Sequence, residues 1–485
     1  MITVTVVITN GLIIPRLGYY YDDWYMLWSG AARGTGLFVS LFSVDRPFIG
    51  VIYALVYRLI GENILGWHLI TLFFRIVGGV AFYWILNLVW PKFKSLLVLA
   101  AMLFVVFPGF LAEPNAATKI NHLIGYAAVL LSIGFSLQAV KTSRSASKYA
   151  CFALSLALMA LYLWIYEYMI GLEVMRVALL FYVLWQAGGA KVIPVVKKVM
   201  RVYWPYVGVA VLFVLWRAFI FKSLRPATNL RTLGMSYLTD PLGMLLQVGV
   251  QTVKDFLSAA LFAWGVEGYH LLASADYKAI ALAGLAAVVV ILLAAWFIFS
   301  ARKAEPLDPE TGSPAMMIGI GALTTLGAVL PVVLTDHSIN LMDPYKSYAL
   351  HPSAGVIIML LGIAALFKAQ PRKVILITLL GIAAATQLLN VQVWANLWSV
   401  ERTFWWQLTW RAPNIRDNTL LMAYAPDGYA FQQDYEVWGP VDLIYRPGPA
   451  KYPLIQAEVL NQDTLQQVFT GVYIEPHDRD IYVPR

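Results

Sequence analysis

The chain has 485 residues, of which 60% are hydrophobic and only 13% are charged, and its formal net charge is +8. Soluble globular domains carry about 25% charged residues, so this composition excludes a soluble globule and predicts a polytopic membrane protein. Lys and Arg fall mainly in short segments between apolar runs, which argues against nucleic acid as a partner. The single cysteine, Cys151, excludes an internal disulfide framework and a cysteine metal cluster.

Residues 1–17 form a first, weakly apolar segment that contains Thr9, Asn10 and Pro15. The segment lacks a basic n-region and a small-residue cleavage site, so we expect no cleavable signal peptide. We expect a short membrane span instead, and whether the natural chain begins further upstream stays open.

Two adjacent acidic residues, Asp22 and Asp23, follow this segment. A charge at the centre of a bilayer costs at least ~2.5 kcal/mol, so both carboxylates are expected to face water or a polar site. The next apolar segments, 23–34 and 47–59, are too short to cross ~30 Å of hydrocarbon. We therefore predict two helices that lie on the membrane surface.

The remaining apolar runs predict an all-α bundle of about eleven transmembrane helices. The segment 241–264 carries too many polar residues for a full span and is expected to be a surface or re-entrant helix. The predicted spans are 1–17, 64–90, 95–111, 122–140, 149–166, 168–187, 202–221, 278–300, 315–334, 352–367 and 374–393.

The charge of the loops predicts the orientation of this bundle. With 47–59 on the surface, the basic loops lie on the side opposite Asp22. Cytoplasmic loops carry an excess of Lys and Arg, so the acidic pair, the loops 222–277 and 335–351 and the chain after 395 are predicted to be extracytoplasmic. The basic loop residues are Lys92, Lys94, Lys141, Arg144, Lys148, Lys191, Lys197, Lys198, Arg201, Arg302, Lys303, Lys368, Arg372 and Lys373.

The composition changes at Trp394, where several tryptophans alternate with charged residues. This pattern predicts an amphipathic helix at the membrane interface. Short β-like runs, divided by Pro, Gly and Asp, follow at 419–424, 441–445 and 471–474. We therefore expect a transmembrane domain at 1–394, with 18–61 as its first external loop, and an extracytoplasmic region at 395–485 that ends in a small α+β appendage.

The first external loop carries a family resemblance. An acidic pair, a surface helix, Arg46-Pro47, a second surface helix that ends near Gly61, and Arg75 in the next span follow one another. This order resembles the GT-C glycosyltransferases, which include the protein mannosyltransferases and the aminoarabinose transferases of lipid A. The resemblance covers 1–190 in order and spacing and the later chain in topology only. Arg-Pro-Phe replaces the usual Lys/Arg-Pro-Pro, and Asp-Asp replaces Asp-Glu, so the sugar is not carried over.

The resemblance implies an inverting transferase in a prokaryotic plasma membrane. Such enzymes move a sugar from a polyprenyl-phosphate donor to a glycan, lipid or protein acceptor at the external face. A carboxylate must take the proton of the acceptor hydroxyl, which is the role implied for Asp22 or Asp23. Arg binds phosphate through a bidentate fork, so Arg46 is the first candidate for the leaving phosphate. Alternatively, the acidic pair only caps the surface helix.

The next external loop contains Glu113 and His122. Some GT-C members place a second acidic residue in this loop, at times with a metal ion. Glu113 together with Asp22 and Asp23 would supply oxygen ligands for a divalent cation. Glu113 and His122 are also candidates for contacts with the sugar or the acceptor. The alternative is a solvated loop without a ligand.

Three further predictions concern polar residues at or inside the spans. Glu173 and Arg176 lie three residues apart on one helix and are expected to form a structural ion pair. Glu167, near the external end of a span, is a candidate for the sugar pocket. The segment around Lys346 resembles the phosphate-binding part of GT-C proteins, so Lys346 is a second phosphate contact. Its neighbours Tyr345 and Tyr348 are candidate substrate contacts, or the segment only anchors the interface.

Two other functions compete with the transferase. A transporter or lipid flippase would need charged groups near the midplane and paired halves, but the acidic residues cluster at one face and no internal repeat is visible. A non-catalytic subunit would keep this fold as a scaffold within a membrane complex, where the aromatic helix and the C-terminal region suit docking. No nucleotide-binding motif occurs, which disfavours direct use of a cytoplasmic nucleotide.

Overall fold

The computed structural model describes residues 1–188, 191–221, 223–224, 237–300, 313–341, 347–424, 431–460 and 470. Within these ranges, nine helices are long and apolar enough to cross a membrane, or ten if the bent pair Pro241–Trp264 and Val266–Ser274 is one span. The predicted all-α, multi-pass membrane protein is therefore confirmed. The re-entrant or surface helix expected at 241–264 corresponds to this bent pair, whose two parts meet at 50°.

The chain divides into two compact units that combine distant segments. Unit 1 comprises Met1–Leu12, Leu72–Ala112 and His122–Asn390, and unit 2 comprises Ile13–Thr71, Glu113–Asn121 and Val391–Arg485. This division differs from the one expected at residue 394, because residues 18–61 and the C-terminal region belong to the same unit.

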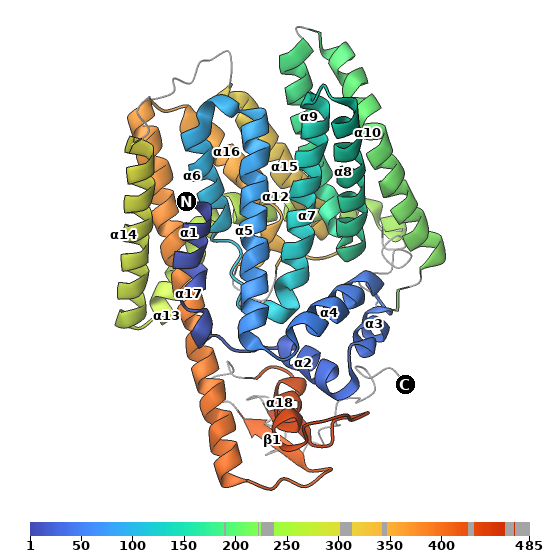
Figure 1. The fold of residues 1–485 in the computed structure, drawn as a ribbon, viewed down its shortest axis with the longest axis vertical. Coiled ribbons are helices and arrows are strands. Elements are labelled where there is room, and N and C mark those ends of the chain that lie inside the picture. The colour runs from blue at the N-terminus through green and yellow to red at the C-terminus, as the bar shows by residue number, and fades with distance from the viewer. Residues whose placement is uncertain are drawn as a thin grey trace. The chain divides into compact units, whose positions relative to one another are not determined.

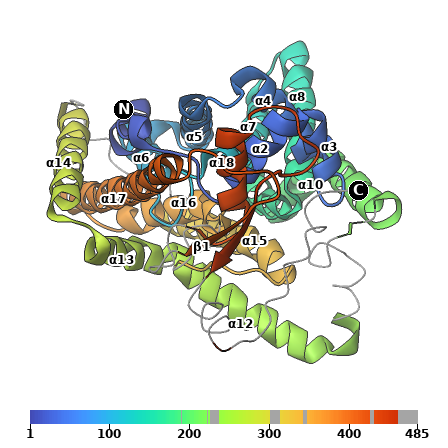
Figure 2. The ribbon, with the colours of Figure 1, turned by 90° about the horizontal axis from the view of Figure 1, so that it is seen from below.

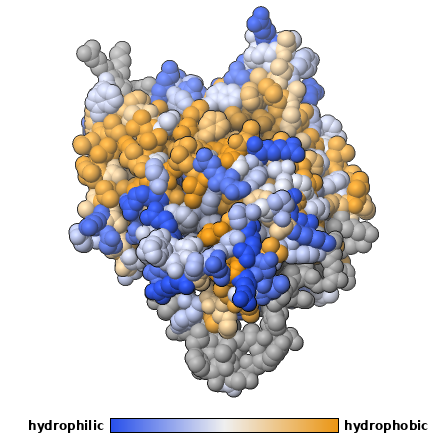
Figure 3. All heavy atoms as spheres, turned by 60° about the horizontal axis from the view of Figure 1, so that its bottom comes forward, coloured by the Kyte–Doolittle hydropathy of each residue, from blue (hydrophilic) through white to orange (hydrophobic). Residues whose placement is uncertain are grey.

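Unit 1 is a bundle of long helices that lie side by side (Figure 1). Large apolar side chains on their outer faces, such as Leu212, Leu292 and Trp296, are exposed, and Figure 3 shows such side chains gathered in broad areas of one face. Contact with lipid explains these exposed apolar faces. Its helices are α1 (Ile2–Val6), α6 (Lys94–Val105), α8 (Ser145–Ile165), α9 (Glu173–Gly188), α10 (Val192–Leu215), α12 (Pro241–Ala260), α13 (Val266–Ser274), α14 (Tyr277–Ser300), α15 (Pro314–Leu334) and α16 (Ser353–Ala365).

Three long helices run from one unit into the other: α5 (Ile64–Val89), α7 (Ala116–Lys141) and α17 (Ala369–Arg411). The predicted count of eleven spans is not confirmed, because two of the expected spans lack a long helix. In 1–17, α1 gives way to a short π-helix and a 3-10 turn. In 95–111, α6 has only 12 residues.

After α6, the chain continues through unit 1 without a helix, and residues 106–112 are all buried. Non-helical backbone is tolerated at membrane depth only where protein groups satisfy its polar atoms. Three polar side chains on spans do this here, at donor–acceptor distances of 2.6 to 3.1 Å. Arg75 Nε donates to Val105 O, Gln387 Nε2 donates to Phe107 O and Phe110 O, and Asn390 Nδ2 donates to Leu111 O.

The helix α17 corrects the prediction of a separate interfacial helix after Trp394. It is one helix of 43 residues, about 65 Å long at 1.5 Å per residue, which is twice the ~30 Å of bilayer hydrocarbon. In its last turns, Trp405 is buried in the core of unit 2, whereas Trp406 and Trp410 are exposed. The tryptophans of this stretch therefore do not form one interfacial face.

The C-terminal region contains a small α+β arrangement. The strand β1 (Leu420–Tyr424) pairs in parallel with β2 (Gln456–Leu460), and α18 (Tyr435–Tyr445) lies between them in the sequence. The strand predicted at 419–424 is confirmed, but the one at 441–445 is wrong because these residues end α18. Val437 and Val441, four residues apart, share the buried face of that helix. The run predicted at 471–474 lies outside the described residues.

Residues 18–61 form three helices in unit 2. The two predicted helices are confirmed as α2 (Asp22–Arg33) and α4 (Pro47–Ile60), and the sequence analysis missed α3 (Gly36–Phe42) between them. The helices approach closely at two glycines. A Cβ at Gly50 would lie 2.4 Å from Phe38 O, and one at Gly30 would lie 2.3 Å from a ring carbon of Tyr57. Glycine therefore fixes how α2 and α3 pack against α4.

Candidate active site

The two adjacent acids at the start of α2 have opposite environments. Asp22 is exposed, whereas Asp23 is fully buried, because successive residues of a helix point about 100° apart. The residue before them, Tyr21, has φ 49° and ψ −124°, a conformation that favours glycine. Such strain costs about 1–3 kcal/mol and persists only where the surrounding contacts enforce it.

Asp23 is held by a cage of hydrogen bonds. Its Oδ1 accepts from Thr118 N at 2.7 Å and from Thr118 Oγ1 at 2.8 Å, and its Oδ2 accepts from Tyr20 N at 3.4 Å. With the Asn115 amide turned so that it can donate, its nitrogen lies 2.7 Å from Oδ1. Thr118 is the third residue of α7, so Asp23 caps the N-terminus of α7 from another helix.

The electrostatics of Asp23 follow from its burial. Burial raises the pKa of this carboxyl to about 7, and the hydrogen bonds from Thr118 oppose the shift. A carboxylate whose oxygens already accept several hydrogen bonds has little capacity left for a substrate proton. Asp23 therefore ties α2 to the start of α7, and Asp22 is the acid that remains accessible.

Arg46 is joined to the same framework. It directly precedes α4, and its Nη1 lies 3.2 Å from Asp45 Oδ2, with 21% of the Arg46 side chain exposed. On α4 itself, Tyr53 donates a hydrogen bond to Thr118 O at 3.1 Å. The carbonyl of Thr118 thus accepts a hydrogen bond from Tyr53 of α4, and its N–H and hydroxyl donate to Asp23 of α2. These contacts position α2, which carries the acidic pair, and α4, which directly follows Arg46.

The C-terminal region supplies a partner for Asp22 that the sequence analysis missed. The Tyr435 hydroxyl, from α18, donates a hydrogen bond to Asp22 Oδ1. Figure 2 shows α18 beside α2. Aromatic contacts hold the two helices together, with Trp28 and Trp438 ring centroids 5.0 Å apart and those of Tyr25 and Trp438 6.0 Å apart. The sequence held no local signal for this contact, since it joins residues 413 positions apart.

Two buried acids in unit 2 were also missed. Trp24 Nε1 donates to Glu401 Oε2 at 3.3 Å, and Gln432 N donates to Glu436 Oε2 at 3.0 Å. The other oxygen of Glu436, Oε1, is buried without a hydrogen-bond partner among the described residues. Burial, aided by the negative charge of Asp22, raises the pKa of Glu436 to about 8. Glu436 is therefore largely protonated at neutral pH.

Glu113 belongs to unit 2 and is buried, so it is not the solvated loop residue of the alternative interpretation. In the described part of the chain, no three His, Cys, Asp or Glu side chains are arranged to hold a metal ion. Cation binding by Asp22, Asp23 and Glu113 stays untested, and we assign no step to a metal.

The remaining candidates belong to unit 1 or fall outside the described residues. His122 Nδ1 lies 2.9 Å from the Tyr168 hydroxyl, and the rings of Tyr168 and Tyr348 are 5.7 Å apart. The buried His122 and the half-buried Tyr348 thus join one aromatic cluster, in which Tyr166 stacks on His122 at 4.2 Å. Glu167 lies between Tyr166 and Tyr168 in the sequence, and its side chain is half-buried. The predicted contacts Tyr345 and Lys346 lie outside the described residues.

No protein-family model and no curated protein matches the sequence. A comparison with solved structures finds similarity to a crystal structure of ArnT from Cupriavidus metallidurans bound to undecaprenyl phosphate. The two chains are 12% identical, with a TM-score of 0.35, over 96% of this chain and 93% of that chain. A TM-score of this size does not establish a shared fold, so the family resemblance rests on the order of residues in the sequence from Asp22 to Arg75.

Proposed function

We propose that the protein is an inverting glycosyltransferase that takes a sugar from a polyprenyl-phosphate donor at the external membrane face. The observation that carries the proposal is the division of roles between Asp22 and Asp23. One acid is buried and caps α7, while its neighbour is exposed at the first position of α2, directly after the strained residue Tyr21. Strained backbone clusters at functional sites, and a helix cap alone would need only one of the two acids.

The proposed reaction uses Asp22 as the general base. The acceptor hydroxyl attacks the anomeric carbon from the face opposite the phosphate, and Asp22 takes its proton as the new C–O bond forms. The bond between the anomeric carbon and the phosphate oxygen breaks, and its electron pair leaves with the polyprenyl phosphate. A single displacement inverts the configuration of the sugar. A positioned base of this kind typically contributes about 10²–10⁴-fold to the rate.

Fixed cations would stabilise the leaving phosphate. Arg46 is partly exposed, and Asp45 orients its guanidinium, which suits a bidentate phosphate contact. Lys346 stays a proposal for the second contact. Glu113, in the same unit as the acidic pair, and His122, Glu167, Tyr345 and Tyr348 are proposed contacts for the sugar or the acceptor.

The proposal places the site on the outside of a prokaryotic plasma membrane, with a glycan, lipid or protein as acceptor. The test is release of polyprenyl phosphate from radiolabelled polyprenyl-phosphate sugars by the purified protein in lipid, with the anomeric configuration of the product read by NMR. Turnover with inversion is expected. A well-folded protein that consumes no donor from a panel of sugars would instead favour the scaffold function.

A further inference from the structure

A buried amide without hydrogen-bond partners lies in the second turn of α7. Asn121 is fully buried, and neither its Oδ1 nor its Nδ2 has a partner among the described residues. In the described part of the chain, it is the one side chain in which two buried polar atoms both lack a partner. Asn121 belongs to unit 2, as do Asp22, Asp23 and Arg46.

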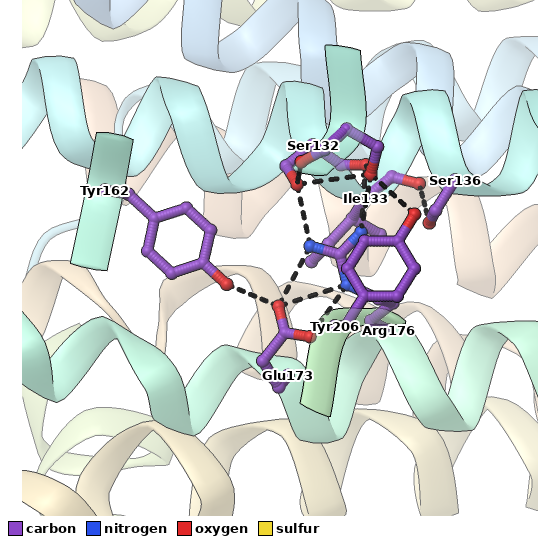
Figure 4. A network of polar contacts seen from close by, with 8 residues as sticks. Ser132, Ile133, Ser136, Tyr162, Glu173, Arg176 and Tyr206 are labelled. Carbon is purple, nitrogen blue, oxygen red and sulfur yellow. Dashed lines mark hydrogen bonds and ion pairs between the residues drawn. The ribbon is translucent and has the colours of Figure 1, made fainter. Parts of the chain in front are cut away.

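A polar side chain further along α7 is satisfied within the protein. Figure 4 shows Ser132 of this helix beside Glu173 and Arg176 of α9. Arg176 Nη2 donates to Ser132 Oγ at 2.7 Å, and Arg176 Nε lies 2.9 Å from Glu173 Oε2, so the predicted ion pair is confirmed. The fold thus supplies partners for Ser132 and supplies none for Asn121 among the described residues.

The chemistry of the amide defines what would satisfy it. A buried polar atom without a hydrogen bond is costly, and in native structures it commonly marks a functional contact or an ordered water. A side-chain amide has one acceptor oxygen and a nitrogen with two N–H donors, so its partner must both donate and accept. An ionised phosphate only accepts, and a hydrocarbon tail does neither. Two neighbouring hydroxyls of a sugar ring can pair with both ends of the amide.

Asn121 lies close to the residue that holds Asp23. It follows Thr118 by three residues on α7, and side chains at this spacing are neighbours on a helix surface. Helical side chains also point back toward the N-terminus of their helix, so the amide lies over the turn that contains Thr118. Thr118 donates its N–H and its hydroxyl to Asp23, which directly follows the proposed base Asp22.

The surface of unit 2 is one helical turn from the amide. Thr118 and Lys119, at the start of α7, are half-buried, and Asp22 is exposed. Side-chain rotamers at binding sites commonly change when a ligand binds. Access to Asn121 therefore requires rearrangement of side chains over that turn.

We propose that Asn121 recognises the sugar of the polyprenyl-phosphate donor, with its amide N–H donating to one hydroxyl and its Oδ1 accepting from a second. The inference rests on the proposed function, which supplies the sugar as the ligand. Asn121 takes no proton in the reaction and is a specificity-determining residue. A site built to bind a hydroxyl rejects a ligand that lacks it, so the amide favours the donor over the product, polyprenyl phosphate.

The test compares equilibrium binding of two ligands to the purified full chain in lipid. One ligand is the radiolabelled polyprenyl-phosphate sugar that wild type binds most tightly from a panel, and the other is polyprenyl phosphate. The ratio of their dissociation constants measures the contribution of the sugar. Asn121→Leu should shrink this ratio by roughly tenfold to a hundredfold and leave the dissociation constant of polyprenyl phosphate unchanged.

The matched control is Asn87→Leu. Asn87 is half-buried on α5 in unit 1, and its Oδ1 is also buried without a partner among the described residues, but the same substitution there should keep the ratio. Without ligand, Asn121→Leu should be at least as stable as wild type, because it removes two unpaired polar atoms. If Asn121→Leu folds poorly, Asn121→Ala supplies the same comparison.

The possible failures are distinguishable. An unchanged ratio in folded Asn121→Leu overturns the inference and leaves the proposed function intact. If that variant also loses stability without ligand, the amide binds an ordered water only. Equal binding of both ligands by wild type overturns the inference as well, because the sugar then contributes nothing. If wild type binds no donor from the panel, the inference and the proposed function both fail.

Discussion

At the scale of single residues, the neighbouring acids Asp22 and Asp23 show how one residue type takes two roles. The sequence pointed to the pair but could not separate its members, because both are aspartates at the start of the same helix. The difference comes from Thr118, which lies 95 positions from Asp23 and reaches only that carboxylate. Whether a polar group is buried depends on partners that are distant in the sequence, so no local pattern predicts it.

Asp23→Ala is expected to lower the stability of unit 2. The substitution leaves the N–H and hydroxyl of the half-buried Thr118 without their acceptor, and loss of a helix cap costs about 0.5–2 kcal/mol. Asp22→Ala is the control, since Asp22 is exposed and loses the hydrogen bond from Tyr435. Thermal unfolding in lipid compares the two. Equal shifts for both variants would contradict the assignment of Asp23 as the cap of α7.

Tyr435 is expected to position Asp22, and the test is a double-mutant cycle. Tyr435→Phe removes only the hydroxyl that fixes one carboxylate oxygen, so kcat should fall by roughly tenfold to a hundredfold while the donor KM stays close to wild type. In the Asp22→Asn background, the same change should have no further effect on turnover.

The matched control for Tyr435 is on the same helix. Tyr445→Phe removes the hydroxyl that donates to Ala412 O at 2.7 Å, and it should leave turnover unchanged. A Tyr435→Phe variant that loses activity only through loss of folded protein would show a structural role and would refute the positioning role.

At the scale of elements, α18 docks on α2 and places Glu436 in a buried site. A buried acid with a raised pKa binds its proton more tightly in the folded than in the unfolded state. The contribution of Glu436 to stability is therefore fully present below about pH 4.5, the ordinary pKa of Glu, and is lost as the pH rises toward the folded pKa of about 8.

Glu436→Gln should remove this contribution. The melting temperature of the variant should exceed that of wild type at pH 8 and approach it near pH 4.5, because Gln cannot ionise. Asp23, whose pKa is also raised by burial, remains in both proteins, so only the difference between them reports on Glu436. A constant difference at all pH values would show that Glu436 does not ionise in this range.

Much of the element structure could be predicted, because its causes are local. Pro47 at the start of α4 and Gly61 after its end bound that helix in the sequence. The continuity of α17 also had a local signal, since no Gly or Pro occurs between Gly381 and Pro413. The tryptophan-rich composition after Trp394 nevertheless predicted a separate interfacial helix. The end of α6 at Val105 could not be predicted from the sequence, because side chains from distant spans stabilise the non-helical segment that follows.

At the scale of the whole molecule, orientation in the membrane stays a prediction from loop charge. It can be tested with single cysteines in a Cys151→Ser background. Gly36→Cys, in the first external loop, should react with a membrane-impermeant maleimide on intact cells. Ser143→Cys, between α7 and α8, should react only after the cells are opened. External labelling of Ser143→Cys, or protection of Gly36→Cys, would reverse the assigned faces.

The central claim of this account is that Asp22 is the base and Asp23 is its structural neighbour. The most direct measurement is turnover of the polyprenyl-phosphate sugar by Asp22→Asn and by wild type, with both proteins shown to be folded by thermal unfolding. The account predicts that turnover falls by about 10²–10⁴-fold in the variant with little change in stability. Turnover at the wild-type rate in folded Asp22→Asn would contradict it.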